Sequence, residues 1–309
     1  DSVSSPPVAP SETGRARLAA IGLMCAAVLL FSLLDTSAKW LGQSMNPLQV
    51  VFARYAGSMI LVLAVINPWS YPGVLRTSRP WLQWGRSLLL LGSTALNFVA
   101  LRYLQLAETI SIMFATPLLV ALASGPLLGE WPGPRRLAAI GVGFIGVLVV
   151  TRPGIGGMHP AALLIVLGCL CYAFYSLSTR MLSGHDSSET TMIYSGAAGT
   201  LATIPLLPWV WETPQTLLPW LLMIAVGALG GFGHWLLILA HRLAPATVLA
   251  PFIYSQIVWM LLLGWLVFDQ LPDRWTFVGA GIVISSGLYL LYRERVRHVP
   301  QEAASARLD

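Results

Sequence analysis

Charged side chains are scarce in this sequence. Asp, Glu, Lys and Arg together make up 10% of its 309 residues, against roughly 25% in an average soluble domain. Lys39 is its one lysine. So little charge cannot cover a globule in water. The hydrophobic share of 56% and the mean hydropathy of +0.72 indicate that most of the surface faces another solvent.

The sequence also lacks the motifs of several protein classes. It contains no G-x-x-x-x-G-K-[ST], H-E-x-x-H or G-x-S-x-G, and no clustered aspartates. Residues 141–146 fit G-x-G-x-x-G, but no acidic residue follows about 20 positions later, as a dinucleotide site requires. Cys25, Cys169 and Cys171 lie in apolar runs without other ligands at metal-site spacing. We expect no enzyme, no metal and no cofactor.

The basic residues do not form a surface for nucleic acid. The formal net charge is +5, but the 18 basic side chains are scattered singly between apolar runs instead of forming a patch. The expected partners are therefore the lipid bilayer and a small-molecule substrate, and the protein is expected to be a monomer or a weak oligomer.

Long apolar stretches dominate what is present. About 20 such residues cross the hydrocarbon layer as a helix, and short connections such as Asn46-Pro47 and Gly133-Pro134 carry turn formers. A cleavable signal peptide is an alternative for residues 15–42, but that stretch is long and holds Asp35 and Lys39, which favours a retained helix. Residues 1–14 and 298–309 are expected to be disordered tails. The ten expected spans are 18–42, 47–66, 81–102, 107–128, 135–151, 160–181, 189–209, 217–239, 244–268 and 275–292.

The basic residues predict the orientation. Arg54 and Arg86 lie within spans and are set aside. With the N-terminus inside, twelve arginines fall on the inner side, and the outer side holds only Lys39, Arg102, Arg152 and Arg274. This positive-inside bias, with an even number of spans, places both termini in the cytoplasm. We expect a multi-pass protein of the cell (inner) membrane.

The sequence repeats itself at a nearly constant interval. Residues 100–107 (ALRYLQLA) match 237–244 (LILAHRLA), and 37–41 match 178–182 at nearly the same separation. The two halves, 15–153 and 158–297, hold five expected helices each, so the second enters from the opposite side. The expected fold is an all-α integral membrane protein of ten transmembrane helices in two inverted five-helix repeats. An inverted repeat favours a binding site near the midplane, between the halves.

The segment from Leu106-Ala107-Glu108 through Pro117 to Leu128-Gly129-Glu130, followed by a glycine-rich helix, resembles the repeat of the drug/metabolite transporter superfamily in its EamA branch. The second copy departs from it at Asp269-Gln270. The resemblance covers about residues 18–292 and implies ten helices, cytoplasmic termini and export of amino acids or other small metabolites. Within the family the chain is most similar to bacterial amino-acid exporters, including the aromatic amino-acid type.

Two polar stripes are candidates for the substrate pathway. Ser32, Asp35 and Lys39 lie on one face of the first helix, and ionisable residues within a span are functional candidates. A structural Asp35–Lys39 pair, or a lysine that reaches the headgroups, is the alternative. The sixth helix carries a corresponding stripe of Tyr172, Tyr175 and Ser176. Its tyrosines suit an aromatic substrate, or else an interface with lipid headgroups.

Other candidates interrupt the remaining central helices. The third and eighth helices each carry one strong polar group at an equivalent position of the repeat: Asn97 in the third and His234 in the eighth. Asn97 bonds either substrate or a neighbouring helix, and His234 either couples protons or is neutral and structural. Thr116 and Tyr254 lie in the fourth and ninth helices beside prolines, which predict hinges or static kinks; these prolines are Pro117 and Pro251.

These features predict a secondary transporter that exports small metabolites, most of all amino acids, aromatic ones among them. Alternating access would use a central cavity between the first, third, fourth, sixth, eighth and ninth helices, with the other four as scaffold. A sugar-phosphate or nucleotide-sugar exchanger is the alternative and requires convergent cations, for which Lys39 and Arg54 are the candidates. A membrane-embedded enzyme explains the apolar composition alone.

Overall fold

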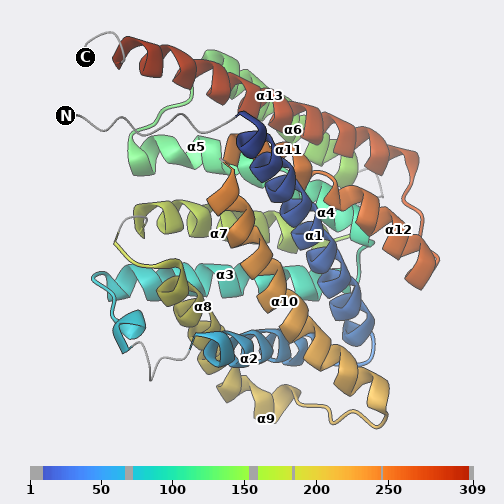
Figure 1. Cartoon of the computed structure of the whole chain (residues 1–309). Coiled ribbons are helices and arrows are strands. Elements are labelled where there is room, and N and C mark those ends of the chain that lie inside the picture. The colour runs from blue at the N-terminus through green and yellow to red at the C-terminus, as the bar shows by residue number, and fades with distance from the viewer. Residues whose placement is uncertain (1–9, 67–71, 153–158, 183–184, 245, 306–309) are drawn as a thin grey trace.

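The computed structural model describes residues 10–66, 72–152, 159–182, 185–244 and 246–305, and these ranges contain helices and connections without a strand (Figure 1). The α-helices are α1 (Pro10–Gly42), α2 (Pro47–Val65), α3 (Pro80–Leu101), α4 (Leu106–Met113), α5 (Thr116–Leu128), α6 (Pro134–Thr151), α7 (Ala161–Leu182), α8 (Ser188–Thr203), α9 (Leu207–Val210), α10 (Leu217–Leu243), α11 (Ala246–Ile253), α12 (Gln256–Phe268) and α13 (Arg274–Ser305). Two 3₁₀ turns, η1 (Pro72–Leu75) and η2 (Ile204–Leu206), complete them.

Turn chemistry explains where several helices begin and end. The Asn46 side chain accepts a hydrogen bond from the Leu48 N–H and caps α2, whose first residue is Pro47. Gly129 ends α5 in the left-handed conformation, with φ of 73°, and Asp269 ends α12 in the same way, with φ of 52°. The Gly129 and Asp269 turns therefore occupy equivalent places in the two halves.

The fourth and ninth spans are each built from two helices. The break between α4 and α5 falls at Phe114 and Ala115, and that between α11 and α12 falls at the equivalent place of the second half, at Tyr254 and Ser255. Pro117 explains the first break, because proline has no N–H to donate to the carbonyl of Met113, four residues before it. Pro251 lies within α11 instead of at the second break.

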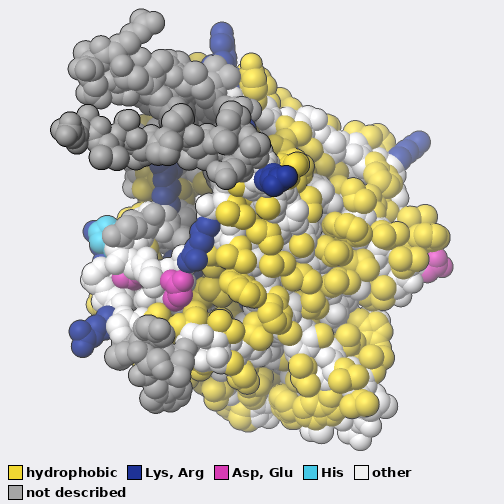
Figure 2. Space-filling view, in the orientation of Figure 1, with side chains coloured by type: hydrophobic (Ala, Val, Ile, Leu, Met, Phe, Trp, Pro, Cys, Tyr) yellow, Lys and Arg dark blue, Asp and Glu magenta, His cyan; other side chains and the backbone are white. Residues whose placement is uncertain are grey.

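Nine helical segments in the described ranges are long and apolar enough to cross a membrane. The helix α3 has 22 residues but is not among them, because it carries polar side chains such as Gln83, Arg86 and Asn97. All three are buried against neighbouring helices. With α3 as the tenth, the expected all-helical, ten-span fold is confirmed. Figure 2 shows the broad apolar face that few charged side chains interrupt.

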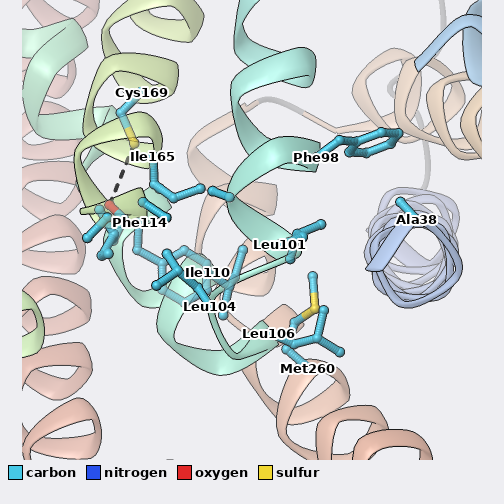
Figure 3. Close-up of a cluster of buried hydrophobic side chains, with 14 of the residues drawn as sticks. Ala38, Phe98, Leu101, Leu104, Leu106, Ile110, Phe114, Ile165, Cys169 and Met260 are labelled. Atoms are coloured by element: carbon cyan, nitrogen blue, oxygen red, sulfur yellow. Dashed lines mark hydrogen bonds between the residues drawn. The ribbon is translucent and has the colours of Figure 1, made fainter. Parts of the chain in front are cut away.

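The helices of the two halves interleave. The helix α1 packs on α10, α2 on α10 and α8, α3 on α7 and α8, and α6 on α13. Figure 3 shows part of the core, where Leu101, Leu104 and Ile110 lie near Ile165 of α7 and Met260 of α12. The free thiol of Cys169 is buried there and bonds the Ile112 carbonyl at 3.7 Å, so it packs inside the protein.

Glycines permit two close crossings. A Cβ at Gly57 of α2 would lie 2.8 Å from the Cα of Gly227 of α10. A Cβ at Gly279 of α13 would lie 2.7 Å from the carbonyl oxygen of Gly146 of α6. Both contacts are shorter than a side chain tolerates, so these pairs fix how closely α2 approaches α10 and α6 approaches α13.

Helix extends into both expected tails. The helix α1 begins at Pro10, where a proline fits the first turn, and α13 continues to Ser305 through a run that includes the helix formers Ala303 and Ala304. Residues 1–9 and 306–309, the ends of the expected tails, lie outside the described residues.

Candidate functional site

A cavity of about 640 Å³ lies between helices of both repeats. It is lined from α2, α3, α7, α8 and α10, and by the connection before α8. Asp186, Ser188 and Arg242 lie where α7 and α10 end and α3 and α8 begin. We call this the mouth end; in Figure 1 it lies at the left, where α7 leads into α8. Pockets of this size hold small molecules.

Arg86 is the most buried cation on the cavity wall. Its side chain is 2% exposed, and its guanidinium carbon lies 4.8 Å from the Tyr175 ring centre. Nε donates to Thr179 Oγ1 at 3.1 Å, Nη2 to Ser195 Oγ at 2.8 Å, and Nη1 to Ser195 Oγ at 3.3 Å and Gln83 Oε1 at 3.5 Å. Side chains of α3 itself and of two neighbouring helices, α7 and α8, therefore hold the guanidinium in a fixed orientation.

The hydroxyl groups around Arg86 are oriented as acceptors. Thr179 donates its own proton to the Tyr175 carbonyl at 2.8 Å, and Ser195 donates to the Thr191 carbonyl at 2.9 Å. Each hydroxyl has one proton and two lone pairs, so both turn lone pairs toward Arg86. These partners are neutral and leave its positive charge uncompensated.

Arg54 lies on the same wall, against the Tyr55 ring at 4.7 Å. The Tyr55 hydroxyl is hydrogen-bonded to Thr94 Oγ1 at 3.0 Å. Asp35, behind the wall, lies within electrostatic reach of Arg54 and accepts a bond from Asn97 Nδ2 at 3.2 Å. Asp35 therefore acts on the charge of Arg54, although no carboxylate lies within 4.0 Å of Arg54 or Arg86 in the described part of the chain.

A hydrogen-bonded group at the mouth end connects the two repeats. Asp186 accepts from Thr77 Oγ1 at 2.5 Å, from Gln83 Nε2 at 2.7 Å and from the Ser78 N–H at 3.4 Å. Partial burial tends to raise the pKa of Asp186, but these hydrogen bonds to its carboxylate lower it below its ordinary value. Gln83 also accepts from Arg86, so Asp186 lies two hydrogen bonds from the buried guanidinium.

Three of the residues predicted for the substrate pathway line the cavity: Tyr172, Tyr175 and His234. The two tyrosine rings lie 5.3 Å apart. His234 contacts the Phe31 ring at 5.1 Å, and its Nδ1 has no hydrogen-bond partner among the described residues. Ser176, one residue beyond Tyr175, is half-buried and not on this wall.

The stripe of the first helix is buried outside the cavity lining. Ser32 donates to the Val28 carbonyl at 2.8 Å. Lys39 Nζ donates to the carbonyls of Leu101, at 2.9 Å, and Leu104, at 2.6 Å. The alternative pair of Asp35 with Lys39 is not formed, since no ion pair between them is found in the part of the chain that the structure describes.

Lys39 marks the end of the molecule opposite the mouth. Its ammonium lies 5.3 Å from the Phe268 ring, so it brings the ends of α1, α3 and α12 together. Nearby in the fold, Gln49 of α2 exchanges two hydrogen bonds with the backbone of Glu212, at 2.9 and 2.7 Å. Neither group belongs to the cavity lining.

The remaining candidates lie at the two helix breaks. Thr116 is buried at the start of α5, next to Pro117. Tyr254 is buried between α11 and α12, contacts the Phe114 ring at 4.9 Å, and has no hydrogen-bond partner for its hydroxyl among the residues described. The two breaks therefore touch each other through their aromatic rings. Pro251 is exposed within α11.

Sequence reasoning missed Arg86 and named Arg54 only as a candidate cation for a phosphate-bearing substrate. It set both aside as basic residues within spans when it predicted the orientation, although a charge in a span requires a polar site. It also assigned the second and seventh helices to the scaffold, whereas α2 and α8 line the cavity. In the described ranges no group of three His, Cys, Asp or Glu residues could hold a metal ion.

Known proteins resemble this chain along most of its length. The EamA-like transporter family matches residues 18–152 and 159–293. A protein of Rickettsia prowazekii named as an S-adenosylmethionine uptake transporter is 27% identical over 85% of this chain and 89% of its own. A riboflavin transporter of Vibrio cholerae is 27% identical, with 86% and 91% covered. A crystal structure that is 19% identical superposes with a TM-score of 0.63, covering 90% of this chain and 98% of the other, and shares the fold.

Proposed function

Because the chain belongs to the EamA-like transporter family, we propose that this membrane transporter exports amino acids or similar small metabolites by alternating access. Its membership confirms the resemblance seen in the sequence, and it makes the chain a transporter of small metabolites and not an enzyme. The substrate class, the direction of transport and the pathway residues are the proposal.

The observation that carries this proposal is the mixed chemistry of the cavity. Arg54 and Arg86 supply two cations, while Tyr55, Tyr172 and Tyr175 supply aromatic faces. A zwitterion with an apolar or aromatic side chain matches both, since guanidinium groups bind carboxylates and tyrosine faces bind rings and ammonium groups.

Alternating access requires an end that opens and an end that closes. The cavity extends to the mouth end, where its lining residues include Asp186 and Arg242. At the opposite end, hydrogen bonds of Lys39 and Gln49 join neighbouring segments. In the opposite state these latter bonds would break and the mouth would close. The paired breaks at Phe114 and Tyr254 are the proposed pivots, since a helix without continuous hydrogen bonds bends most readily there.

The test is flux from proteoliposomes that contain the purified full-length chain. Vesicles loaded with labelled L-phenylalanine should release it faster than protein-free vesicles, and external unlabelled amino acids should compete or exchange. An imposed pH gradient shows whether protons are coupled. Release no faster than from protein-free vesicles for any member of an aromatic, aliphatic and polar amino-acid panel would contradict amino-acid transport.

A second candidate is uptake of S-adenosylmethionine or riboflavin, which the relatives at 27% identity favour. Both molecules carry a ring system that suits the tyrosine-lined wall. Phosphorylated metabolites are the third candidate, because three arginines line the cavity: Arg54, Arg86 and Arg242. Including these two molecules and glucose 6-phosphate in the same panel ranks the candidates, and the compound with the fastest protein-dependent flux identifies the class.

A further inference from the structure

We propose that Arg86 is the oxyanion-binding group of the cavity and that substrates bind with a carboxylate or phosphate against its guanidinium. This rests on the proposed function in that the cavity must be the substrate site. It goes beyond that function by naming one cation, among several in the fold, as the group that selects the charge of the substrate.

The first support is an uncompensated buried charge. Arg86 is 2% exposed, and no carboxylate lies within 4.0 Å of it in the described part of the chain. An ionised group taken out of water costs several kcal/mol unless an opposite charge offsets it. The nearest carboxylate by hydrogen bonds is that of Asp186, on the far side of Gln83. An anion in the cavity would supply the missing compensation.

The second support is that the guanidinium is already oriented. The guanidinium carbon lies over the Tyr175 ring, Thr179 accepts from Nε, and Ser195 accepts from both terminal nitrogens. Three side-chain oxygens accept four hydrogen bonds from a group with five N–H donors, so one N–H, on Nη2, remains for a ligand. The two Nη1 bonds are the longest, at 3.3 and 3.5 Å, and a ligand oxyanion that replaces them meets both terminal nitrogens. A fixed guanidinium fork binds carboxylate and phosphate oxygens in pairs, which a mobile ammonium does not match.

The third support is that the other cations have partners. Arg54 has Asp35 within electrostatic reach. Arg242, at the mouth, pairs with Glu189 at 3.1 Å. Lys39 binds two backbone carbonyls away from the cavity. Of the three arginines on the cavity wall, Arg86 is the most buried, and its four hydrogen bonds all go to neutral groups.

The experiment measures binding to the purified full-length chain in detergent, by calorimetry, with two matched pairs of ligands. L-phenylalanine is compared with L-phenylalaninamide, and glucose 6-phosphate with glucose. In each pair the members differ chiefly in the oxyanion. The wild-type chain should bind the charged member of at least one pair about tenfold more tightly or better, as for hydrogen bonds to charged groups. The pair that shows the preference identifies carboxylate or phosphate.

Variants assign the preference to Arg86. Arg86→Gln should abolish it, and Arg86→Lys, which keeps the charge but loses the fork, should retain only part. Ser195→Ala should weaken it by releasing the terminal nitrogens. Arg180→Gln is the matched control: Arg180 lies on α7 near the same end, but it is exposed and pairs with Glu130 outside the cavity. It should behave as wild type.

Equal binding of both members of each pair by the wild-type chain overturns the proposal, as does an undiminished preference in Arg86→Gln. If that variant does not fold, Arg86→Lys and Ser195→Ala decide, and wild-type preference in both overturns it. Flux data separate this result from the proposed function. Amino-acid flux without an Arg86-dependent preference supports the proposed function and contradicts the role of Arg86. The preference without flux supports oxyanion binding by Arg86 and contradicts amino-acid transport.

Discussion

At the scale of single residues, the buried charges of the helices are each held in a different way. Lys39 binds two carbonyls, Asp35 accepts from Asn97, Arg54 lies on Tyr55, and Arg86 is held by hydroxyls and a ring. Unpaired charges in a span cost a few kcal/mol at least. The contacts therefore distinguish charges that the protein itself satisfies, such as that of Lys39, from a charge available to a ligand, that of Arg86.

Lys39→Met should destabilise the protein. The substitution keeps an unbranched side chain but leaves the carbonyls at the end of α3 without the ammonium that now binds them. Leaving a buried carbonyl unsatisfied costs about 1–3 kcal/mol, so thermal unfolding in detergent should shift downward. Ser37→Ala, two residues away with a bond only to its own helix at Leu33, is the control. Equal unfolding temperatures of the two variants would contradict the role of Lys39.

Asp186 should make stability depend on acid pH. Its pKa is lowered from 3.8 by hydrogen bonds to its carboxylate, so the unfolded chain binds its proton at higher pH than the folded chain does. Its contribution is present above pH 3.8 and is lost as the pH falls through the lower folded-state pKa. The measurement is unfolding of wild type and Asp186→Asn from pH 6 to pH 3. The pKa of Asp273 is also lowered, by hydrogen bonds that outweigh its partial burial, but both proteins share it. A constant difference between the two proteins across this range would contradict the prediction.

How far the sequence predicts the site differs by residue. Tyr172, Tyr175 and His234 stand out because polar groups are rare in apolar helices, and they line the cavity. Arg86 could not be placed from its own segment, because its partners Thr179 and Ser195 lie 93 and 109 residues away. The stripe of Ser32, Asp35 and Lys39 shows the converse: spacing on a helix indicates a shared face, but not whether that face meets a cavity or another helix.

At the scale of helices, the apolar runs predict ten spans whose ends agree with the structure to within a few residues at most ends. The breaks are harder. Pro117 locates the first, because a missing N–H acts locally. No proline lies three residues after Tyr254 as Pro117 does after Phe114. The second break is located only by its equivalent position in the repeat. The polar helix α3 is a span because α7 and α8 bury its side chains, and this depends on the fold.

Gly279→Ala should destabilise the α6–α13 crossing. A Cβ there would lie 2.5 Å from Val150 Cγ2 and 2.7 Å from the Gly146 carbonyl oxygen, and overpacking of this kind costs about 1–3 kcal/mol. Gly281→Ala is a matched control on the same helix, since nothing lies within 4 Å of its Cβ position. Thermal unfolding of both in detergent makes the comparison. Similar destabilisation by the two would show that the crossing does not depend on the missing side chain.

At the scale of the whole molecule, two halves that each hold five spans bring distant segments into one cavity. The matched turns of Gly129 and Asp269 and the matched breaks at Phe114 and Tyr254 share one separation along the chain. Recurring sequence patterns therefore predict the architecture well. They do not predict the substrate, because the residues that repeat are those that turn and pack helices.

The orientation predicted from the basic residues, with both termini in the cytoplasm, places the mouth on the cytoplasmic side of the membrane. In a background with Cys25, Cys169 and Cys171 replaced by serine, Ser188→Cys at the mouth should react with a membrane-impermeant thiol reagent from the cytoplasmic side only. Gln215→Cys, exposed between α9 and α10 at the opposite end, should react from the outside only. Labelling in intact cells and in inverted vesicles makes the measurement. The reverse pattern would place both termini outside.

Lys39 also determines how the protein reacts with reagents that modify side-chain amines. The chain has one lysine, 3% exposed, whose nitrogen is engaged by two carbonyls. In this conformation, acylating reagents find no accessible side-chain amine, and tryptic digestion depends on arginines alone. Separation of α1, α3 and α12 would uncover that amine. The rate at which Lys39 is acylated then measures how often this end of the protein opens. The measurement needs no inserted label.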